Sequence, residues 1–182
     1  MKRLEPKSPA EKRILLFAAL AGAAALAADL LTKFWVLRCF DLYESREIIP
    51  GIFAFTSVRN PGAAWSIFSG HAIGLMIFGL LAGAALIYFA RYLAEGCAER
   101  FFAIALVISG IIGNSIDRIR FNEVVDFIHV HWYDQWHYPI FNVADMAICC
   151  GVTIFLISNF FRKSKRESGD DASGERESDK RG

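Results

Sequence analysis

Cysteine is scarce in this sequence, and its four copies do not form a recognisable framework. They stand at positions 39, 97, 149 and 150, with no CxxC or CxxxC spacing among them. Such an arrangement indicates neither a structural zinc site nor a disulfide framework. The chain also lacks a surplus of charge of either sign, since its formal net charge is +1. Composition therefore gives no support for nucleic-acid binding.

Charged residues are nearly missing from four long apolar stretches, which lie at about residues 14–37, 73–92, 101–119 and 140–161. Apolar residues make up 54% of the 182 residues, a share too high for an ordinary soluble fold, and the length allows one domain. A helix of about 20 residues is long enough to cross a bilayer. The pattern therefore predicts an all-α integral membrane protein with four transmembrane helices.

The charges gather instead at the two ends of the chain. Residues 1–13 are interpreted as a cytoplasmic N-terminal arm, and residues 14–161 as a four-span membrane domain. Residues 162–182 are mostly charged residues, Ser and Gly, which predicts a disordered cytoplasmic tail. Lys and Arg flank the first and last apolar stretches, and such residues favour the cytoplasmic side. Four spans then place both ends there and the segments 38–70 and 120–139 outside.

The first apolar stretch has a second interpretation, as a cleaved signal peptide. A basic start, an apolar run and the small residues Ala25-Leu26-Ala27 fit such a signal. The mature chain would then begin at Ala28 or Asp29. The apolar pattern resumes at residues 34–37, however, which favours a retained helix.

The two outer segments differ in pattern. Residues 48–49 and 52–58 flank a Pro50-Gly51 turn and are typical of short strands. Residues 120–139 are predicted to form a polar, aromatic-rich loop.

Polar side chains in the predicted spans share one depth. With a rise of 1.5 Å per residue, they fall near the outer ends of their helices, and the inner halves carry almost none. The residues are Asp29, Lys33, Asn114, Asp117, Arg118 and Asp145. Ionisable groups are expensive within a bilayer, so this shared depth points to a site that opens outward.

Several of these residues also fit purely structural roles. Asp29 and Lys33 are four residues apart, so they can neutralise each other on one helix face. Asn114 and Asn142 can bridge helices through side-chain hydrogen bonds, and support of a site is an equal alternative for them. The adjacent residues at positions 117 and 118 point in different directions, so each needs another partner.

Asp126 and Asp145 differ, because no basic residue nearby in the sequence neutralises either of them. Two carboxylates brought close together do not both ionise readily, and near neutral pH they share one proton. The ionised member can then take a proton from water while the protonated member donates one to an amide. Such a pair hydrolyses a peptide bond without a metal or a covalent intermediate.

Five separated motifs resemble those of the lipoprotein signal peptidase family (signal peptidase II), which are four-span aspartic peptidases of the bacterial inner membrane. The motifs are Asp29-Leu30-Leu31-Thr32-Lys33, Asn60-Pro61-Gly62-Ala63-Ala64, Gly113-Asn114-Ser115-Ile116-Asp117-Arg118, Val124-Val125-Asp126-Phe127 and Phe141-Asn142-Val143-Ala144-Asp145. Each motif alone is weak, but all five in order, within residues 14–161, form a specific signal.

The resemblance implies a role for each matched residue, with Asp126 and Asp145 as the catalytic pair. The residues implied to support them, or to contact substrate, are Asn60, Asn114, Arg118, Asn142, Asp29, Lys33 and Asp117. Of these, Asp117 is assigned a structural role in which it holds Arg118 or a loop backbone.

The resemblance also implies a small extracytoplasmic β-cradle beside the four helices, and an active site near the outer leaflet of the bacterial inner membrane. The expected substrates are diacylglyceryl-modified prolipoproteins, cut on the N-terminal side of the lipidated cysteine. We expect a monomer surrounded by membrane lipids, with no cofactor, no metal and no nucleic-acid partner.

A zinc site is one alternative. His129, His131, Asp134 and His137 lie within nine residues, and Asp126 could join them. The HxH spacing would put two imidazoles on one face of a strand.

Two further alternatives use the span residues. A transporter could pass ions along a relay of Asp29, Lys33, Asp117 and Asp145, but polar residues should then line the whole bilayer thickness. A serine-lysine peptidase would need a serine beside Lys33, and the candidates at positions 66 and 115 lack a supporting motif.

Overall fold

Four long helices and a small sheet at one end of them make up the computed structural model, which describes residues 8–62, 70–133 and 135–179. The helices are α1 (Pro9–Cys39), α2 (Ala72–Ala94), α3 (Ala98–Phe121) and α4 (Val143–Asp179). In the described residues, all four are long and apolar enough to cross a membrane, α4 over Val143–Arg162. The prediction of a mostly helical, four-span protein is confirmed.

Helix α1 begins earlier than the apolar stretch alone predicts. The Ser8 side chain accepts a hydrogen bond from the Glu11 amide at 3.1 Å, and Pro9 stands at the first helical position. Both features stabilise a helix N-terminus. Residues 9–13 of the predicted arm are therefore helical, while residues 1–7 lie outside the described part. The helix runs without a break through the alternative cleavage site at residues 25–27.

Helix α3 is the central helix, and it contacts each of the other three. It approaches α4 closely because two glycines face carbonyl groups across the interface. A Cβ on Gly151 would lie 2.6 Å from the Ala103 carbonyl oxygen, and one on Gly110 would collide with the Ala144 carbonyl oxygen. Small residues allow helix backbones to meet in this way.

The end of the bundle far from the sheet is closed by a buried arginine. Arg100 is only 3% exposed, and its Nε donates to the Ser158 hydroxyl at 3.1 Å. Its Nη1 donates to the Leu93 carbonyl at 3.1 Å and pairs with Glu95 at 3.0 Å. These contacts join α2, α3 and α4, and they place one buried charge at the inner end, where the sequence suggested almost none.

The sheet is antiparallel with strand order β1-β2-β3-β4. Its strands are β1 (Ser45–Ile49), β2 (Phe53–Asn60), β3 (Val124–Trp132) and β4 (Trp136–His137). The first two were predicted from the sequence pattern and are confirmed. The prediction of a loop over residues 120–139 is wrong, because this segment contains β3 and β4. Strand β3 pairs with β2 and is mostly apolar, and its residues Val125 and Phe127 join a core with Val36 of α1.

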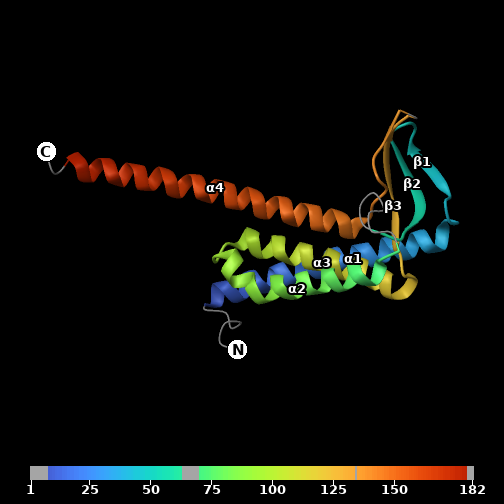
Figure 1. The fold of residues 1–182 in the computed structure, drawn as a ribbon, viewed down its shortest axis with the longest axis horizontal. Coiled ribbons are helices and arrows are strands. Elements are labelled where there is room, and N and C mark those ends of the chain that lie inside the picture. The colour runs from blue at the N-terminus through green and yellow to red at the C-terminus, as the bar shows by residue number, and fades with distance from the viewer. Residues whose placement is uncertain (1–7, 63–69, 134, 180–182) are drawn as a thin grey trace.

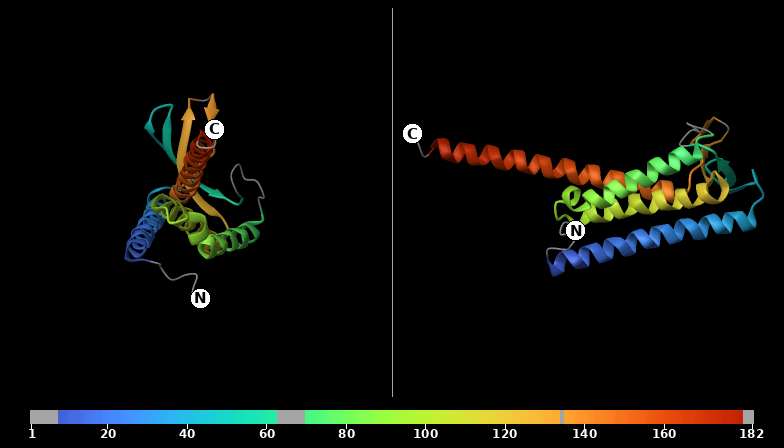
Figure 2. Two further views of the ribbon diagram at one scale, coloured as in Figure 1. Left: turned by 90° about the vertical axis from the view of Figure 1, so that its left-hand side faces the viewer. Right: turned by 60° about the horizontal axis from the view of Figure 1, so that its bottom comes forward.

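Strands and helices run in nearly perpendicular directions. The sheet lies across one end of the bundle and projects sideways past the start of α4 (Figure 1, Figure 2). At the other end, α4 continues beyond its membrane-spanning part to Asp179 and extends away from the bundle (Figure 1). The sequence predicts disorder for residues 162–182, whereas the structure is helical as far as Asp179. An isolated polar helix gains little from packing, so disorder of this tail in solution stays a prediction.

Candidate active site

Lys33 of α1 is the centre of a buried polar network at the sheet end of the bundle. Its Nζ lies 2.8 Å from Asp29 Oδ2 and 2.9 Å from Asp117 Oδ2, and it donates to Asn114 Oδ1 at 3.0 Å. The expected pair of Asp29 and Lys33 is present, and both residues are at most 2% exposed. The ammonium group thus makes two ion pairs and one hydrogen bond, and α1 is fixed to α3.

Asp29 also connects α1 to the beginning of α4. Its Oδ1 accepts a hydrogen bond from the Ala144 amide at 2.8 Å. A carboxylate is favourable there, because the first amides of a helix lack partners within the helix. Gly113 of α3 leaves the space for this contact, since a Cβ at that position would collide with Asp29 Oδ2.

Asp117 holds the first residues of β3. Its Oδ2 accepts from the Val125 amide at 3.2 Å in addition to its ion pair with Lys33. The sequence assigned Asp117 to hold Arg118 or a loop backbone, and in the structure it holds the backbone of strand β3. Arg118, in contrast, turns to other partners and donates to the carbonyl oxygens of Gly62 at 2.9 Å and Asn114 at 3.4 Å.

Asn142 and Asp145 form a capping box on the first turn of α4. The Asp145 amide donates to Asn142 Oδ1 at 2.9 Å, and the Asn142 amide donates to Asp145 Oδ2 at 3.3 Å. This reciprocal pairing satisfies two backbone donors at the helix start. It also fixes the position of the Asp145 carboxylate, whose Oδ1 accepts from Asn114 Nδ2 at 2.7 Å.

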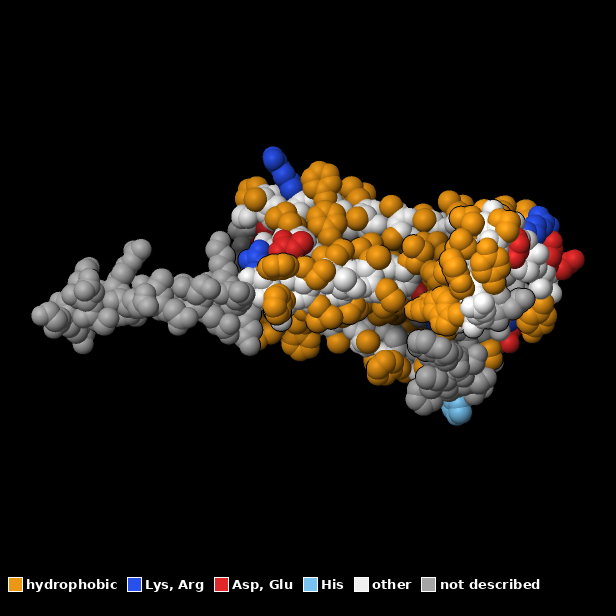
Figure 3. Space-filling model, turned by 90° about the horizontal axis from the view of Figure 1, so that it is seen from above, with side chains coloured by type: hydrophobic (Ala, Val, Ile, Leu, Met, Phe, Trp, Pro, Cys, Tyr) orange, Lys and Arg blue, Asp and Glu red, His pale blue; other side chains and the backbone are white. Residues whose placement is uncertain are grey.

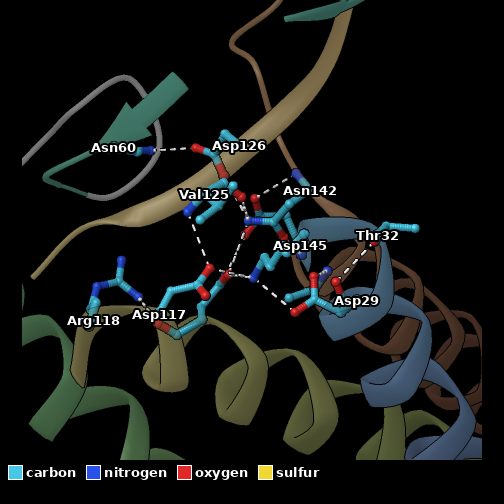
Figure 4. A network of polar contacts seen from close by, with 12 residues as sticks. Asp29, Thr32, Asn60, Asp117, Arg118, Val125, Asp126, Asn142 and Asp145 are labelled. Carbon is cyan, nitrogen blue, oxygen red and sulfur yellow. Dashed lines mark hydrogen bonds and ion pairs between the residues drawn. The ribbon is translucent and has the colours of Figure 1, made fainter. Parts of the chain in front are cut away.

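The same Asn142 side chain reaches the second carboxylate. Its Nδ2 donates to Asp126 Oδ1 at 2.7 Å and to Asn114 Oδ1 at 3.0 Å, and the residue is fully buried. Asn60 of β2 donates to the other Asp126 oxygen at 3.0 Å. Figure 4 shows Asp126 above Asp145 with Asn142 beside both. One asparagine thus bonds to both acidic residues.

Burial is the main influence on Asp126, which is 2% exposed. Burial and, as the second cause, the negative charge of Asp145 raise the pKa of this carboxyl from 3.8 to about 7. Hydrogen bonds from Asn60 and Asn142 act in the opposite direction. Asp126 is thus suited to carry a proton near neutral pH.

Comparison with known proteins assigns the chain to a family. Residues 21–161 match the family model described as Signal peptidase (SPase) II. The lipoprotein signal peptidase of Syntrophotalea carbinolica is 40% identical over 154 residues, which cover 83% of this chain and 93% of that protein. Its counterpart in Listeria monocytogenes serotype 4a is 41% identical over 146 residues, which cover 78% and 93%. The chain belongs to the signal peptidase II family.

Two solved structures, both described as bacterial membrane enzymes, share the fold of this signal peptidase II family member. One has a TM-score of 0.76 at 33% identity and covers 82% of this chain and 90% of its own. The other has a TM-score of 0.69 at 35% identity, with 78% and 91% covered. Family and spans together identify a protease that is a multi-pass bacterial membrane protein.

The structure brings the nine residues that the sequence of this signal peptidase II family member singled out into one connected region. They are Asp29, Lys33, Asn60, Asn114, Asp117, Arg118, Asp126, Asn142 and Asp145. Sequence reasoning missed the backbone donors of Val125 and Ala144. No residue type could have indicated them, because every non-proline residue carries the same amide.

The histidines of the zinc alternative lie apart from the contacts of this network. His129 Nε2 and His137 Nδ1 are 3.1 Å apart, and the rings of His129, His131 and His137 stack. Burial and the two neighbouring imidazoles lower the pKa of His129. Among the described residues, no group of three or more His, Cys, Asp or Glu could hold a metal ion, and Asp134 lies outside them.

The serine-lysine alternative gains no support from the described residues. Lys33 is occupied by Asp29, Asp117 and Asn114, so its ammonium group is not placed as a base for a serine. Ser115 is 4% exposed, and no contact between it and Lys33 is seen. Residue 66 lies outside the described residues.

Proposed function

We propose that this protein is an aspartic endopeptidase in which Asp126 and Asp145 activate one water molecule. The observation that carries the proposal is the position of Asn142, which donates from Nδ2 to Asp126 and from its backbone amide to Asp145. The contact with Asp126 is buried, and the contact with Asp145 is partly buried. A carboxyl pair joined in this way can share one proton, and its titration belongs to the pair rather than to either residue.

In the proposed mechanism the shared proton of the pair is assigned to Asp126 at rest, because burial and Asp145 raise the pKa of Asp126 to about 7. Asp145, in the ionised form, takes a proton from the water as the water oxygen bonds to the scissile carbonyl carbon. The Asp126 proton moves to the carbonyl oxygen, which gives a neutral tetrahedral diol. The proton that Asp145 gained then moves to the leaving nitrogen, one diol proton returns to Asp126, and the carbon–nitrogen bond breaks.

The surrounding groups keep this arrangement in place. Asn60 and Asn142 each donate to one oxygen of Asp126. Each oxygen keeps a further lone pair, and one of them can carry the proton used in the reaction. Lys33 pairs with both Asp29 and Asp117, so its positive charge reduces the negative charge that these two carboxylates place beside the pair. Arg118 adds a positive charge beside Asp126 and Asp145.

The substrates of this protein are diacylglyceryl-modified prolipoproteins, cut on the N-terminal side of the lipidated cysteine. The names of its relatives, lipoprotein signal peptidases at about 40% identity, support this assignment. Depth supports it too, because Asp145 lies in the first turn of the spanning part of α4. A scissile bond beside a lipid anchored in the outer leaflet would lie at that level.

In this proposal the protein is a monomer of the bacterial inner membrane with both ends cytoplasmic. Residues 1–13 form the arm, 14–161 the catalytic domain and 162–182 the tail. N-terminal sequencing of the protein purified from membranes tests the first span. A start at Ala28 or Asp29 would defeat the four-span topology.

The decisive experiment is cleavage of a diacylglyceryl-modified prolipoprotein by the wild type, Asp126→Asn and Asp145→Asn, each with and without EDTA. Both variants should lose nearly all activity, and EDTA should leave the wild type unchanged. Asp41→Asn is the matched control, because Asp41 is an exposed carboxyl residue before β1. Appreciable activity in either active-site variant contradicts the pair. Loss with EDTA and recovery with zinc would transfer the chemistry to a metal.

A further inference from the structure

The far end of the sheet is a separate surface that the catalytic network does not use. Here the turn between β1 and β2 meets the turn between β3 and β4. The Tyr133 amide donates to the Gly51 carbonyl at 2.6 Å, and the His131 amide donates to the Ile52 carbonyl at 2.9 Å. Gly51 has a φ of +73° and packs against the Tyr133 ring, where a Cβ would lie 2.5 Å from Cε1. The two turns therefore form one packed unit, called the sheet tip below.

The sheet tip exposes large apolar and aromatic side chains. They are Ile48 (54% exposed), Ile49 (49%), Ile52 (38%), Trp132 (54%), Tyr133 (58%) and Trp136 (53%). Within the described residues 48–58, 127–133 and 135–141 there is no Asp, Glu, Lys or Arg. Contiguous exposed apolar surface of this kind marks an interaction site.

Its position in the fold indicates the partner. The strands run across the ends of the helices, so the tip extends sideways over the region beside α4 that lipid occupies around a four-span bundle (Figure 1, Figure 2). Figure 3 shows hydrophobic side chains along the helices and again at the sheet end of the molecule. The tip thus continues the lipid-facing surface of the spans.

The chemistry of the tip fits a bilayer interface better than a water-exposed surface or the hydrocarbon interior. Trp and Tyr combine an apolar ring with one polar group, and they gather at membrane–water interfaces. Ile48, Ile49 and Ile52 add purely apolar surface. Residues 48–58, 127–133 and 135–141 add no desolvation penalty from Asp, Glu, Lys or Arg. Charged residues border them in the sequence at Glu47 and Asp134.

We propose that the sheet tip inserts into the boundary between headgroups and acyl chains of the outer leaflet, beside α4. Amphipathic elements of this kind enter to a depth of roughly 5–10 Å. The insertion anchors the distal end of β2 and β3, whose other ends carry Asn60 and Asp126. Lipid and the buried network thus hold the sheet at its two ends. The proposal does not depend on the proposed catalytic chemistry.

The test uses the full chain in phosphatidylcholine–phosphatidylglycerol vesicles, with Trp136 as the only tryptophan and the other three changed to Phe. Lipids brominated near the top of the acyl chain should quench its fluorescence more strongly than lipids brominated near the chain end. Aqueous iodide should quench it weakly. A chain that keeps only Trp35, near the end of α1, is the positive control. A chain with its single tryptophan at Ser178→Trp, in the polar tail, is the control for exposure to water.

Strong quenching by iodide without quenching by the lipids would overturn the proposal. So would protection from both quenchers, because a protein partner or a second copy would then cover the tip. Should the three-Phe variant fail to fold, the wild type labelled with fluorotryptophan provides the same measurement. Spin-labelled lipids should then broaden the fluorine signals of Trp132 and Trp136, and unbroadened signals would contradict insertion.

Discussion

Asn142 and Asp145 share two hydrogen bonds across the first turn of α4. The side-chain amide of Asn142 also donates to Asp126 at 2.7 Å. The helix start and the candidate catalytic pair are therefore the same structure. Two substitutions at position 142 separate the two roles. Serine keeps a side-chain oxygen that can cap the helix but lacks the side-chain NH2 that donates to Asp126, whereas alanine lacks both groups.

We expect Asn142→Ser to lower kcat at least about tenfold, the equivalent of one hydrogen bond of roughly 1.4 kcal/mol. Asn142→Ala should lose as much activity and also about 0.5–2 kcal/mol of stability through the missing cap. Cleavage kinetics and thermal unfolding in detergent measure the two quantities. Equal stability of the two variants would contradict the capping role.

Asp126 should make stability depend on pH in a defined window. Its pKa is raised from 3.8 to about 7, so the folded state binds more protons than the unfolded state between these values. Its contribution to stability is then fully present below about pH 4 and is lost as the pH rises to about 7. The Asp126→Asn variant should gain stability relative to the wild type over this range. A constant difference in Tm from pH 4 to 7 would refute the raised pKa.

Activity should also depend on the protonation of Asp126. In the proposed mechanism Asp126 must be protonated and Asp145 ionised, so kcat/KM should fall as the pH rises above about 7. The profile of kcat/KM against pH, measured with one lipid-modified substrate, reports these values for the free enzyme. Activity that stays constant well above pH 7 would contradict protonated Asp126 as the acid.

Lys33→Met should be strongly destabilising, because it leaves the buried carboxylates of Asp29 and Asp117 without their cation. Removal of one partner from a buried ion pair costs about 3–5 kcal/mol. Lys33→Met combined with Asp29→Asn and Asp117→Asn should recover part of that loss, since no uncompensated charge then remains. Unfolding free energies of the single and triple variants provide the comparison, and no recovery in the triple variant would count against an electrostatic cause.

Gly113→Ala should disturb the link between α1 and α4, because the new methyl group would collide with Asp29 Oδ2. Gly74→Ala in α2 is the matched control, since a Cβ there meets no atom within 4 Å. In a helix interior, alanine is favoured over glycine by roughly 0.5–1 kcal/mol, so the control should be neutral or more stable. The Tm of Gly113→Ala should fall below that of the wild type. Equal gains in both variants would contradict the close contact.

Structural features set by residues close together in the sequence could be predicted, and features that depend on distant residues could not. The four spans follow directly, because about 20 apolar residues in a row have few other stable forms. Strands β1 and β2 follow from a local turn signal at Pro50-Gly51. Strand β3 was not predicted, because polar residues flank its apolar run within 120–139 and no local turn signal pairs it with a neighbour. Its hydrogen-bond partners come from β2, some seventy residues earlier.

The same division holds for the site. Depth singled out Asp145 and the other span residues, because polar groups in an apolar span are few and are costly to bury. Asp126, outside the spans, was singled out by its motif and by the lack of a basic residue near it in the sequence. Only the tertiary structure decided how they pair. Asp117 meets Lys33 from another helix, and one asparagine bonds to both candidate catalytic residues. Directional hydrogen bonds depend on how helices and strands approach one another, and residue order along the chain does not contain that geometry.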